Sequence, residues 1–284
     1  ACTMLSGCSA QAQALTSDVE PVVIEDSVIT QEHTDMLADF SYTMLRHFTA
    51  EQEENILISP LSAWLVLTMT GQGANGDTAD EFAWFSRQLD AAGQRELAAW
   101  LIEYLTQYDT VEETGAEIDI ANSVWCDDAL TVNDSFVDIA KAYYRAEIIQ
   151  QDLQAPGAVK TVNDWISTAT KERIQNMLDQ IDKNAVMLLI NALTLDAKWQ
   201  DAFDIANTAE DLFYLPDGAE LKKEFLHKRL TNASYLHWDG GEGIVLPYQE
   251  NSLSMIALMP DEAYSCDDII KKLHSVWLRE LQDN

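Results

Sequence analysis

Basic residues are scarce in this chain. Its 17 lysines and arginines face 48 aspartates and glutamates, which gives a formal net charge of −31 over 284 residues. The shortage is concentrated in residues 1–140, where 25 acids accompany only three bases. Such a surface repels phosphate backbones, so the sequence excludes nucleic acid as a partner. Two interpretations of the acidity stay open: a solubility adaptation to an acidic or salty habitat, and a specific basic partner.

Cysteine is also sparse, and its spacing excludes a zinc site. The four cysteines form no Cys-x-x-Cys pair, and no histidine lies at ligand spacing from any of them. We interpret Cys126 and Cys266 as buried thiols, with a disulfide between them as the alternative.

The sequence lacks the common catalytic signatures. It contains no Gly-x-Ser-x-Gly elbow, no His-Glu-x-x-His helix and no P-loop, and its five histidines are scattered. Residues 71–76 match the Gly-x-Gly-x-x-Gly dinucleotide fingerprint, but they follow an expected helix instead of a strand. The tryptophans fall mostly on core-facing stripes, which favours packing over a ligand cage. We therefore expect neither an enzyme nor a cofactor.

No hydrophobic run is long enough to span a bilayer, yet the N-terminus carries a membrane signal. The segment Leu5-Ser6-Gly7-Cys8 is similar to the lipobox of bacterial lipoprotein signal peptides, in which Cys8 would carry the lipid. Residues 9–30 are polar, acidic and unpatterned, as is typical of a tether. We therefore expect a signal remnant and tether over residues 1–30 and one domain over 31–284. The expected location is outside the cytoplasm, on a bacterial cell surface through the lipid or secreted.

The clearest helix start is Ser59, which can cap a helix that has Pro60 at its first position. The apolar run that follows leaves almost no polar face, so this helix is expected to be buried on all sides. Thr78 with Glu81 predicts a capping box for the next helix.

Periodicity predicts the remaining elements. The expected helices cover residues 34–50, 79–89 and 93–107, begin near Asn133 and Pro156, and end with one from Ser265 to about Leu281. The expected strands cover residues 118–124, 146–152 and 185–195, the last buried on both faces, with short strands across 209–259. Helices dominate the first half and strands the second, which predicts an α+β fold.

Short motifs then follow one another in an order that is typical of one family. The segment from Asn55 combines Ser59-Pro60-Leu61-Ser62 with Gly73-Ala74-Asn75-Gly76-Asp77-Thr78. Further motifs are Ala121-Asn122, Val162-Asn163-Asp164-Trp165-Ile166, Asn191-Ala192, Trp199 with Phe203, Leu246-Pro247-Tyr248, and Ser254-Met255 to Leu258-Met259-Pro260. On these motifs the chain resembles the serpin family over about residues 34–281.

The resemblance implies a serpin fold, with three β-sheets surrounded by about eight to nine helices. It also implies a suicide-substrate inhibitor of serine or cysteine proteases, whose cleaved reactive loop inserts into the central sheet as a new strand. The expected partner is the target protease, and a monomer is expected for the full-length protein. The alternative is a non-inhibitory serpin-like protein with a binding or structural role.

The resemblance also assigns mechanical roles to four residues. Ser59, Ser62 and Asn191 match the polar shutter beneath the sheet, and Trp199 matches the breach where insertion begins. Ordinary packing of a polar core and an indole is the alternative for each of them.

Two features depart from the family pattern. Residues 193–197, Leu-Thr-Leu-Asp-Ala, stand where the family has aromatic residues followed by Lys-Gly. The hinge, the reactive loop and the closing strands of a serpin have no counterpart up to Asn284. We therefore expect a central sheet that lacks strands.

Overall fold

The computed structural model describes residues 12–50, 55–86, 89–110, 115–215, 217–230, 234–249 and 253–283. Contacts divide the chain into two compact units. Unit 1 comprises Ala1–Gln107 and Ile118–Leu195, and unit 2 comprises Tyr108–Glu117 and Asp196–Asn284. The proposed lipid site, Cys8, lies outside the described residues.

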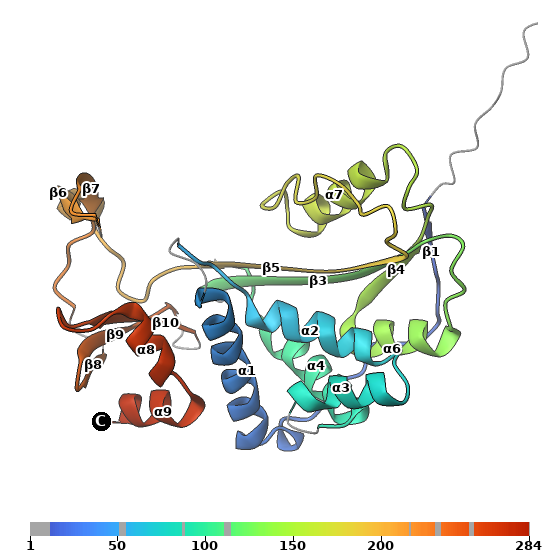
Figure 1. Ribbon diagram of the computed structural model, residues 1–284, viewed down its shortest axis with the longest axis horizontal. Coiled ribbons are helices and arrows are strands. Elements are labelled where there is room, and N and C mark those ends of the chain that lie inside the picture. Colours follow the sequence, from blue (N-terminus) through green and yellow to red (C-terminus); the bar gives the residue numbers. More distant parts are fainter. Residues whose placement is uncertain are drawn as a thin grey trace, which may run out of the picture. The chain divides into compact units, whose positions relative to one another are not determined.

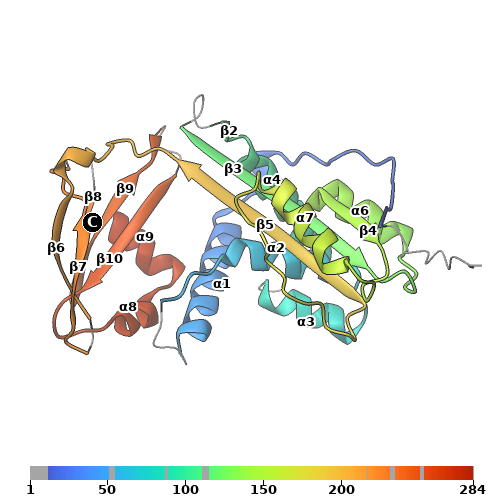
Figure 2. The ribbon, with the colours of Figure 1, turned by 90° about the horizontal axis from the view of Figure 1, so that it is seen from above.

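Unit 1 is built on a β-sheet with helices on both faces (Figures 1 and 2). The strands β1, β4 and β3 are neighbours in that order, and β5 also pairs with β3. Their bounds are Gln13–Ala14 for β1, Ala116–Cys126 for β3, Ala146–Gln150 for β4 and Met187–Ala197 for β5. Strand β4 runs parallel to β3 and antiparallel to β1. The Asp127 amide donates to the Val186 carbonyl, and the Asn191 side chain donates to that of Asn122. Residue numbers therefore rise along β3 as they fall along β5, so the two strands are antiparallel.

The helices of unit 1 form two layers. α7 lies on one face of the sheet, whereas α2, α4 and α6 lie on the other (Figure 1). The bounds are Gln31–Thr49 for α1, Pro60–Gly71 for α2, Asp77–Phe85 for α3, Ala91–Thr106 for α4, Asp134–Tyr144 for α6 and Ala158–Ala169 for α7. A large hydrophobic cluster joins α2, α4 and α6 to the sheet, and a smaller one joins α7 to Trp125 and Ile149. Each sheet face is thereby buried against its own helical layer.

The beginnings of α2 and α3 show where local sequence rules hold and where they fail. Ser59 caps α2 by accepting a 3.4 Å hydrogen bond from the Ser62 amide, as predicted. The expected burial of α2 on all sides is wrong, because Leu67 is 37% exposed. The predicted Thr78 capping box is also wrong, because α3 starts at Asp77, two residues before the expected start, with Gly76 as its N-cap. Gly76 adopts φ 58°, a conformation that favours glycine, so the backbone turns there without a side-chain cap.

Further differences from prediction have local causes. The helix expected at Pro156 begins at Ala158, after Gly157 turns the chain at φ 100°. Strand β5 is half-buried instead of buried on both faces. Trp84 is an exception to the expectation that most tryptophans face the core, since it is 76% exposed.

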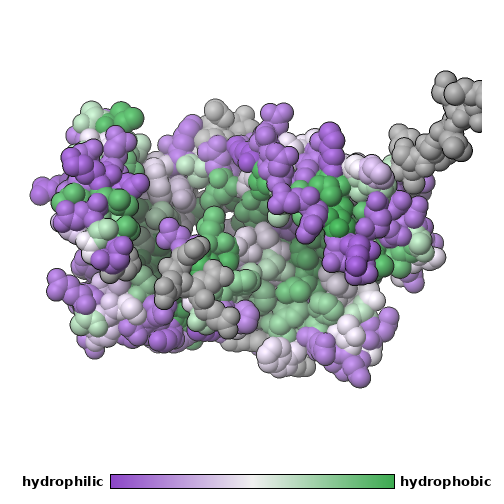
Figure 3. Space-filling model, turned by 45° about the horizontal axis from the view of Figure 1, so that its top comes forward, coloured by the Kyte–Doolittle hydropathy of each residue, from purple (hydrophilic) through white to green (hydrophobic). Residues whose placement is uncertain are grey.

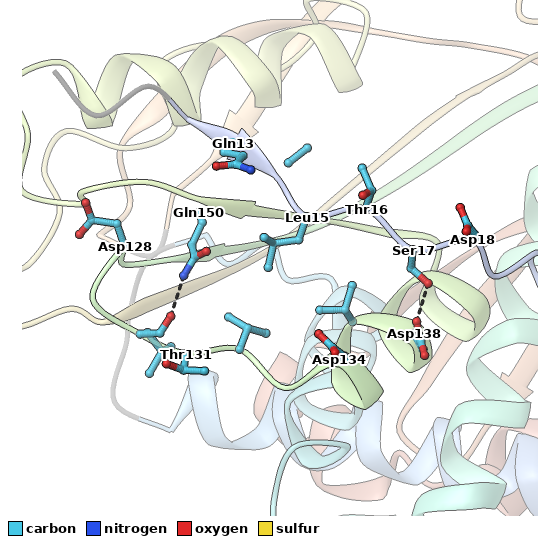
Figure 4. Close-up of a pocket in the computed structure, with 14 residues that line it drawn as sticks. Gln13, Leu15, Thr16, Ser17, Asp18, Asp128, Thr131, Asp134, Asp138 and Gln150 are labelled. Carbon is cyan, nitrogen blue, oxygen red and sulfur yellow. Dashed lines mark hydrogen bonds between the residues drawn. The ribbon is translucent and has the colours of Figure 1, made fainter. Parts of the chain in front are cut away.

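The N-terminal segment differs from the expected tether over its described part. We name residues 13–29 the N-terminal strap, because they lie along unit 1 and bond to it. The Leu15 amide donates to the Ile148 carbonyl and the Val22 amide to the Ala142 carbonyl, both at 2.8 Å. Figure 4 shows the Ser17 hydroxyl donating a hydrogen bond to the Asp138 carboxylate, and both residues line a cavity beside the strap. Leu15 and Ile29 pack against the large hydrophobic cluster, so the strap is part of the folded unit.

Unit 2 is mainly antiparallel β-structure. Strands β10, β9 and β8 form one sheet in that order, and β6 pairs with β7 as a hairpin. The bounds are Asp109–Thr110 for β2, Ala209–Tyr214 for β6, Glu220–Phe225 for β7, Ser234–Trp238 for β8, Gly241–Pro247 for β9 and Ser254–Pro260 for β10. Helix α8 (Cys266–Lys272) contacts β10, and α9 (Ser275–Asp283) contacts β8. The single helix predicted from Ser265 is therefore two helices, because Leu273 is extended at ψ 117°.

The two described cysteines are free thiols, which contradicts the alternative of a disulfide. Cys126 is fully buried in β3, and burial raises the pKa of its thiol to about 11. Cys266 at the start of α8 is exposed, so the prediction of a buried thiol is confirmed for Cys126 and wrong for Cys266.

The strap predicts a measurable stability effect. Replacing Leu15 by alanine removes an anchor on the hydrophobic cluster, so we expect Leu15→Ala to lower the free energy of unfolding by about 1–2 kcal/mol. The neighbouring Thr16 is exposed, and Thr16→Ala is expected to change it by less than about 0.5 kcal/mol. Urea denaturation of both variants measures the difference. Equal effects would contradict a packed strap.

Candidate functional site

Two amide side chains, Asn122 (buried) and Asn191 (half-buried), join the two long strands of unit 1. Asn191 on β5 donates from Nδ2 to Oδ1 of Asn122 on β3 at 2.8 Å. Asn122 in turn donates from Nδ2 to the Tyr144 carbonyl at 2.7 Å. Asn122 is 2% exposed, and the buried Oδ1 of Asn191 has no hydrogen-bond partner. These contacts fix the register of β3, β5 and the end of α6 through polar groups within an apolar layer.

Ser59 and Ser62 form a second polar pair at the start of α2. The Ser59 hydroxyl donates to the Ser62 hydroxyl at 2.8 Å. Ser59 is exposed and Ser62 half-buried, so the pair lies at the border of the helical layer. The hydroxyls cap the helix, and they also present hydrogen-bonding groups at its edge.

A groove lies beside β5, and we name it the edge groove. Its cavity volume is about 290 Å³. No residue of β3 lines it, so it lies along the edge of β5 that β3 does not occupy. Among the described residues, no strand pairs with that edge. The lining residues are Ser62, Ala63 and Val66 of α2, Ile166 of α7, Met177 and Leu178 of the following loop, and Leu189, Ile190 and Asn191 of β5.

The structure therefore brings together two of the three shutter residues predicted from sequence. Ser62 and Asn191 line the same groove, whereas Ser59 contacts it only through its bond to Ser62. Sequence reasoning placed Asn122 in a strand but did not select it as a site residue. The available signal was an amide side chain at a position where the alternate residues Ile118, Ile120 and Val124 are apolar.

Trp199 belongs to unit 2. Its ring stacks on Tyr248 with centroids 4.5 Å apart, and Phe203 meets its edge at 6.1 Å. The two chain segments also pair, since the Gln200 amide donates to the Pro247 carbonyl at 3.0 Å. Trp199 thus joins the end of β5 to the segment after β9 by aromatic packing.

The groove region carries no catalytic arrangement in the part of the chain that the structure describes. There, no group of three or more His, Cys, Asp or Glu side chains is placed to hold a metal ion. Burial raises the pKa of the Tyr144 hydroxyl far above its usual value, so this phenol stays neutral and receives a hydrogen bond from Gln72 at 3.3 Å. Over the same ranges, the helices are too short or too polar to cross a bilayer.

Hydrophilic and hydrophobic residues are unevenly distributed on the surface. In the view of Figure 3, hydrophilic residues (purple) lie mainly on the outer parts of the face and hydrophobic residues (green) gather in its middle.

Comparisons with known proteins identify the family. The serpin model, described as serine protease inhibitor, matches residues 35–284. Serpin-Z7 of Hordeum vulgare is 30% identical over 231 residues, covering 77% of this chain and 57% of its own length. Corticosteroid-binding globulin of Pongo abelii is 27% identical over 202 residues, covering 70% of this chain and 49% of its own length. The chain belongs to the serpin family.

Solved structures support the same fold. A thermophilic serpin, tengpin, in its native state matches with a TM-score of 0.83 and 30% identity, covering 96% of this chain and 69% of that one. AtSerpin1 of Arabidopsis in its native stressed conformation matches with a TM-score of 0.79 at 23% identity, covering 90% and 68%. The predicted α+β serpin fold is thereby confirmed. The chain spans just over half the length of the curated relatives it matches.

The amide chain predicts unequal effects of two similar substitutions. Asn122→Ala removes two hydrogen bonds and leaves the Tyr144 carbonyl and the Asn191 amide without partners, so we expect a loss of about 2–3 kcal/mol of unfolding free energy. Asn191→Ala removes one hydrogen bond together with an oxygen that already lacks a partner. We therefore expect a smaller loss of unfolding free energy, about 1 kcal/mol.

Urea denaturation of the two single variants and the double variant measures this coupling. The double variant should lose less than the sum of the single losses, because the two side chains share a bond. Asn207→Ala, at an exposed position of unit 2, is the control. Additive losses would contradict a connected chain.

Proposed function

We propose that the full-length protein is a protease inhibitor of the serpin type, directed at serine or cysteine proteases. The observation that carries this proposal is the match of the serpin family model to residues 35–284. The groove beside β5, lined by Ser62 and Asn191, supports it. In such an inhibitor the cleaved loop adds as a strand at the edge of β5, where it pairs with backbone N–H and C=O groups.

The mechanism follows from this edge. A protease attacks an exposed reactive loop, and its nucleophile becomes acylated by the cleaved chain. The freed loop then adds as a strand beside β5, and this burial displaces the attached enzyme from its productive geometry. Asn191 and Ser62 would meet the incoming strand, since both line the groove. Asn122 would hold β3 and β5 in register while the sheet edge is filled.

Trp199 has a supporting role in this proposal. Its stack on Tyr248 fixes the chain directly after β5. Aromatic packing makes this segment rigid, which is what the proposed breach role requires of Trp199.

The inhibitory proposal is tested with the full-length gene product and a panel of serine and cysteine proteases. We expect at least one protease to form a complex that survives denaturing electrophoresis, because the acyl bond is covalent. We also expect cleavage of the reactive loop to raise the melting temperature, because an added strand satisfies the edge of β5. Absence of both results across the panel would reject inhibition.

A non-inhibitory binding protein is the second candidate. The similarity to corticosteroid-binding globulin supports it, because the name of that relative describes a binding protein. A full-length protein that forms no complex and gains no thermal stability on cleavage would favour this candidate.

We further propose that the protein is lipid-anchored outside the cytoplasm through Cys8. The supporting observation is the segment Leu5-Ser6-Gly7-Cys8, which has the residue types of a lipoprotein processing site. Expression of the full-length precursor in a bacterium with labelled palmitate is expected to label the protein in the membrane fraction. Cys8→Ser should abolish the label, and Cys266→Ser is the control. Equal labelling of both variants would reject anchoring at Cys8.

A further inference from the structure

The loop after α7 forms one wall of the edge groove, and two sets of contacts hold it. Residues 170–186 connect α7 to β5, and Met177 and Leu178 within them line the groove. At one point Asn163 of α7 brackets Leu178: its Nδ2 donates to the Leu178 carbonyl at 2.8 Å, and its Oδ1 accepts from the Leu178 amide at 2.9 Å. The position of this wall is therefore set on the α7 side.

A charged cluster holds the same loop against the sheet. Asp119 lies on β3, and its carboxylate meets Lys171 Nζ at 3.0 Å and an Arg173 guanidinium nitrogen at 3.4 Å. Thr194 on β5 donates its hydroxyl to the same carboxylate at 3.3 Å. Asp119 thus touches both long strands and the loop. Its side chain is only 24% exposed, which limits screening by solvent.

Three residues of this loop have backbone conformations that are unfavourable for residues other than glycine. Lys171, Glu172 and Asn176 have φ values of 50°, 64° and 52°, in the left-handed region that non-glycine residues rarely adopt. Such a conformation persists only where surrounding contacts impose it. The Asp119 cluster holds the first of these residues, Lys171, and also Arg173, which directly follows the second. The Asn163 bracket lies two residues beyond the third.

We propose that Asp119 is a positioning residue for the edge groove, which holds residues 171–178 as its wall and so limits how readily a strand enters beside β5. The inference rests on the proposed strand-accepting function, and it adds a residue that controls access to the groove. Asp119 does not line the groove itself. It acts through Lys171 and Arg173, which fix the strained segment that leads to Met177 and Leu178.

The first measurement is amide hydrogen exchange of residues 171–178 in the complete chain. We expect Asp119→Asn to speed exchange there by about five-fold, as loss of a partly buried ion pair would. Asp164→Asn is the matched control, because Asp164 lies on α7, is 62% exposed and pairs with Lys160. Asp119→Glu should restore slow exchange in part. Exchange that is equal in Asp119→Asn and the wild type overturns the proposal.

The second measurement is strand entry. The probe is a fluorescein-labelled, acetylated peptide of about twelve alternating valine and threonine residues, a length that matches a long strand. We expect Asp119→Asn to raise its association rate about five-fold over the wild type, and Asp164→Asn to leave the rate unchanged. Faster loop exchange with an unchanged association rate overturns the positioning role.

A further variant and outcome keep the two hypotheses separate. If Asp119→Asn does not fold, the double variant Lys171→Gln with Arg173→Gln removes the same attraction from the loop side and carries the same expectations. If the peptide associates with no variant and not with the wild type, the strand-accepting function is contradicted, while loop exchange still decides whether Asp119 holds the wall.

Discussion

The backbone hydrogen bonding of β5 is the constraint on which the rest of unit 1 depends. A strand offers N–H and C=O groups along two edges, and among the described residues β5 is paired along the edge that faces β3. The opposite edge borders a groove between α2 on one side of the sheet and α7 with its loop on the other. Because the helical layers limit where a new strand can lie, the groove defines one direction of growth for the sheet. The function proposed for this unit therefore depends on backbone pairing along that edge.

Features that depend on neighbouring residues could be predicted from the sequence, and features that depend on distant ones could not. Ser59 and Asn133 cap their helices as expected, because a cap needs only side chains within one turn. The break at Leu273 was missed because the apolar stripe continues across it from α8 into α9. The strap was missed for a similar reason: it bonds to β4 through main-chain groups, which any sequence possesses. Asn191 meets Asn122 across 69 residues, so no local pattern could pair them.

The family resemblance supplied what local rules could not, but it did so unevenly. It identified Ser62 and Asn191, which the structure brings to one groove, through motifs more than a hundred residues apart. It did not identify Asn122 or Asp119, whose roles follow from contacts particular to this fold. Asn122 satisfies two partners within a buried layer, so its amide is required whatever enters the groove. The motifs therefore identified residues that line the groove, whereas the structure was needed to identify Asn122 and Asp119, which hold the strands and the loop around it.

The Asp119 cluster is notable because basic residues are scarce in this chain. With 48 acids and 17 bases, most carboxylates have no cation to pair with, and like charges repel across the surface. Two of the few bases nevertheless converge on Asp119. Each left-handed non-glycine residue costs about 1 kcal/mol, whereas a partly exposed ion pair contributes at most about 1 kcal/mol. The two ion pairs therefore offset only part of the cost of the three residues, and the Asn163 bracket is needed as well. In our proposal this balance is what lets a competing strand displace the loop.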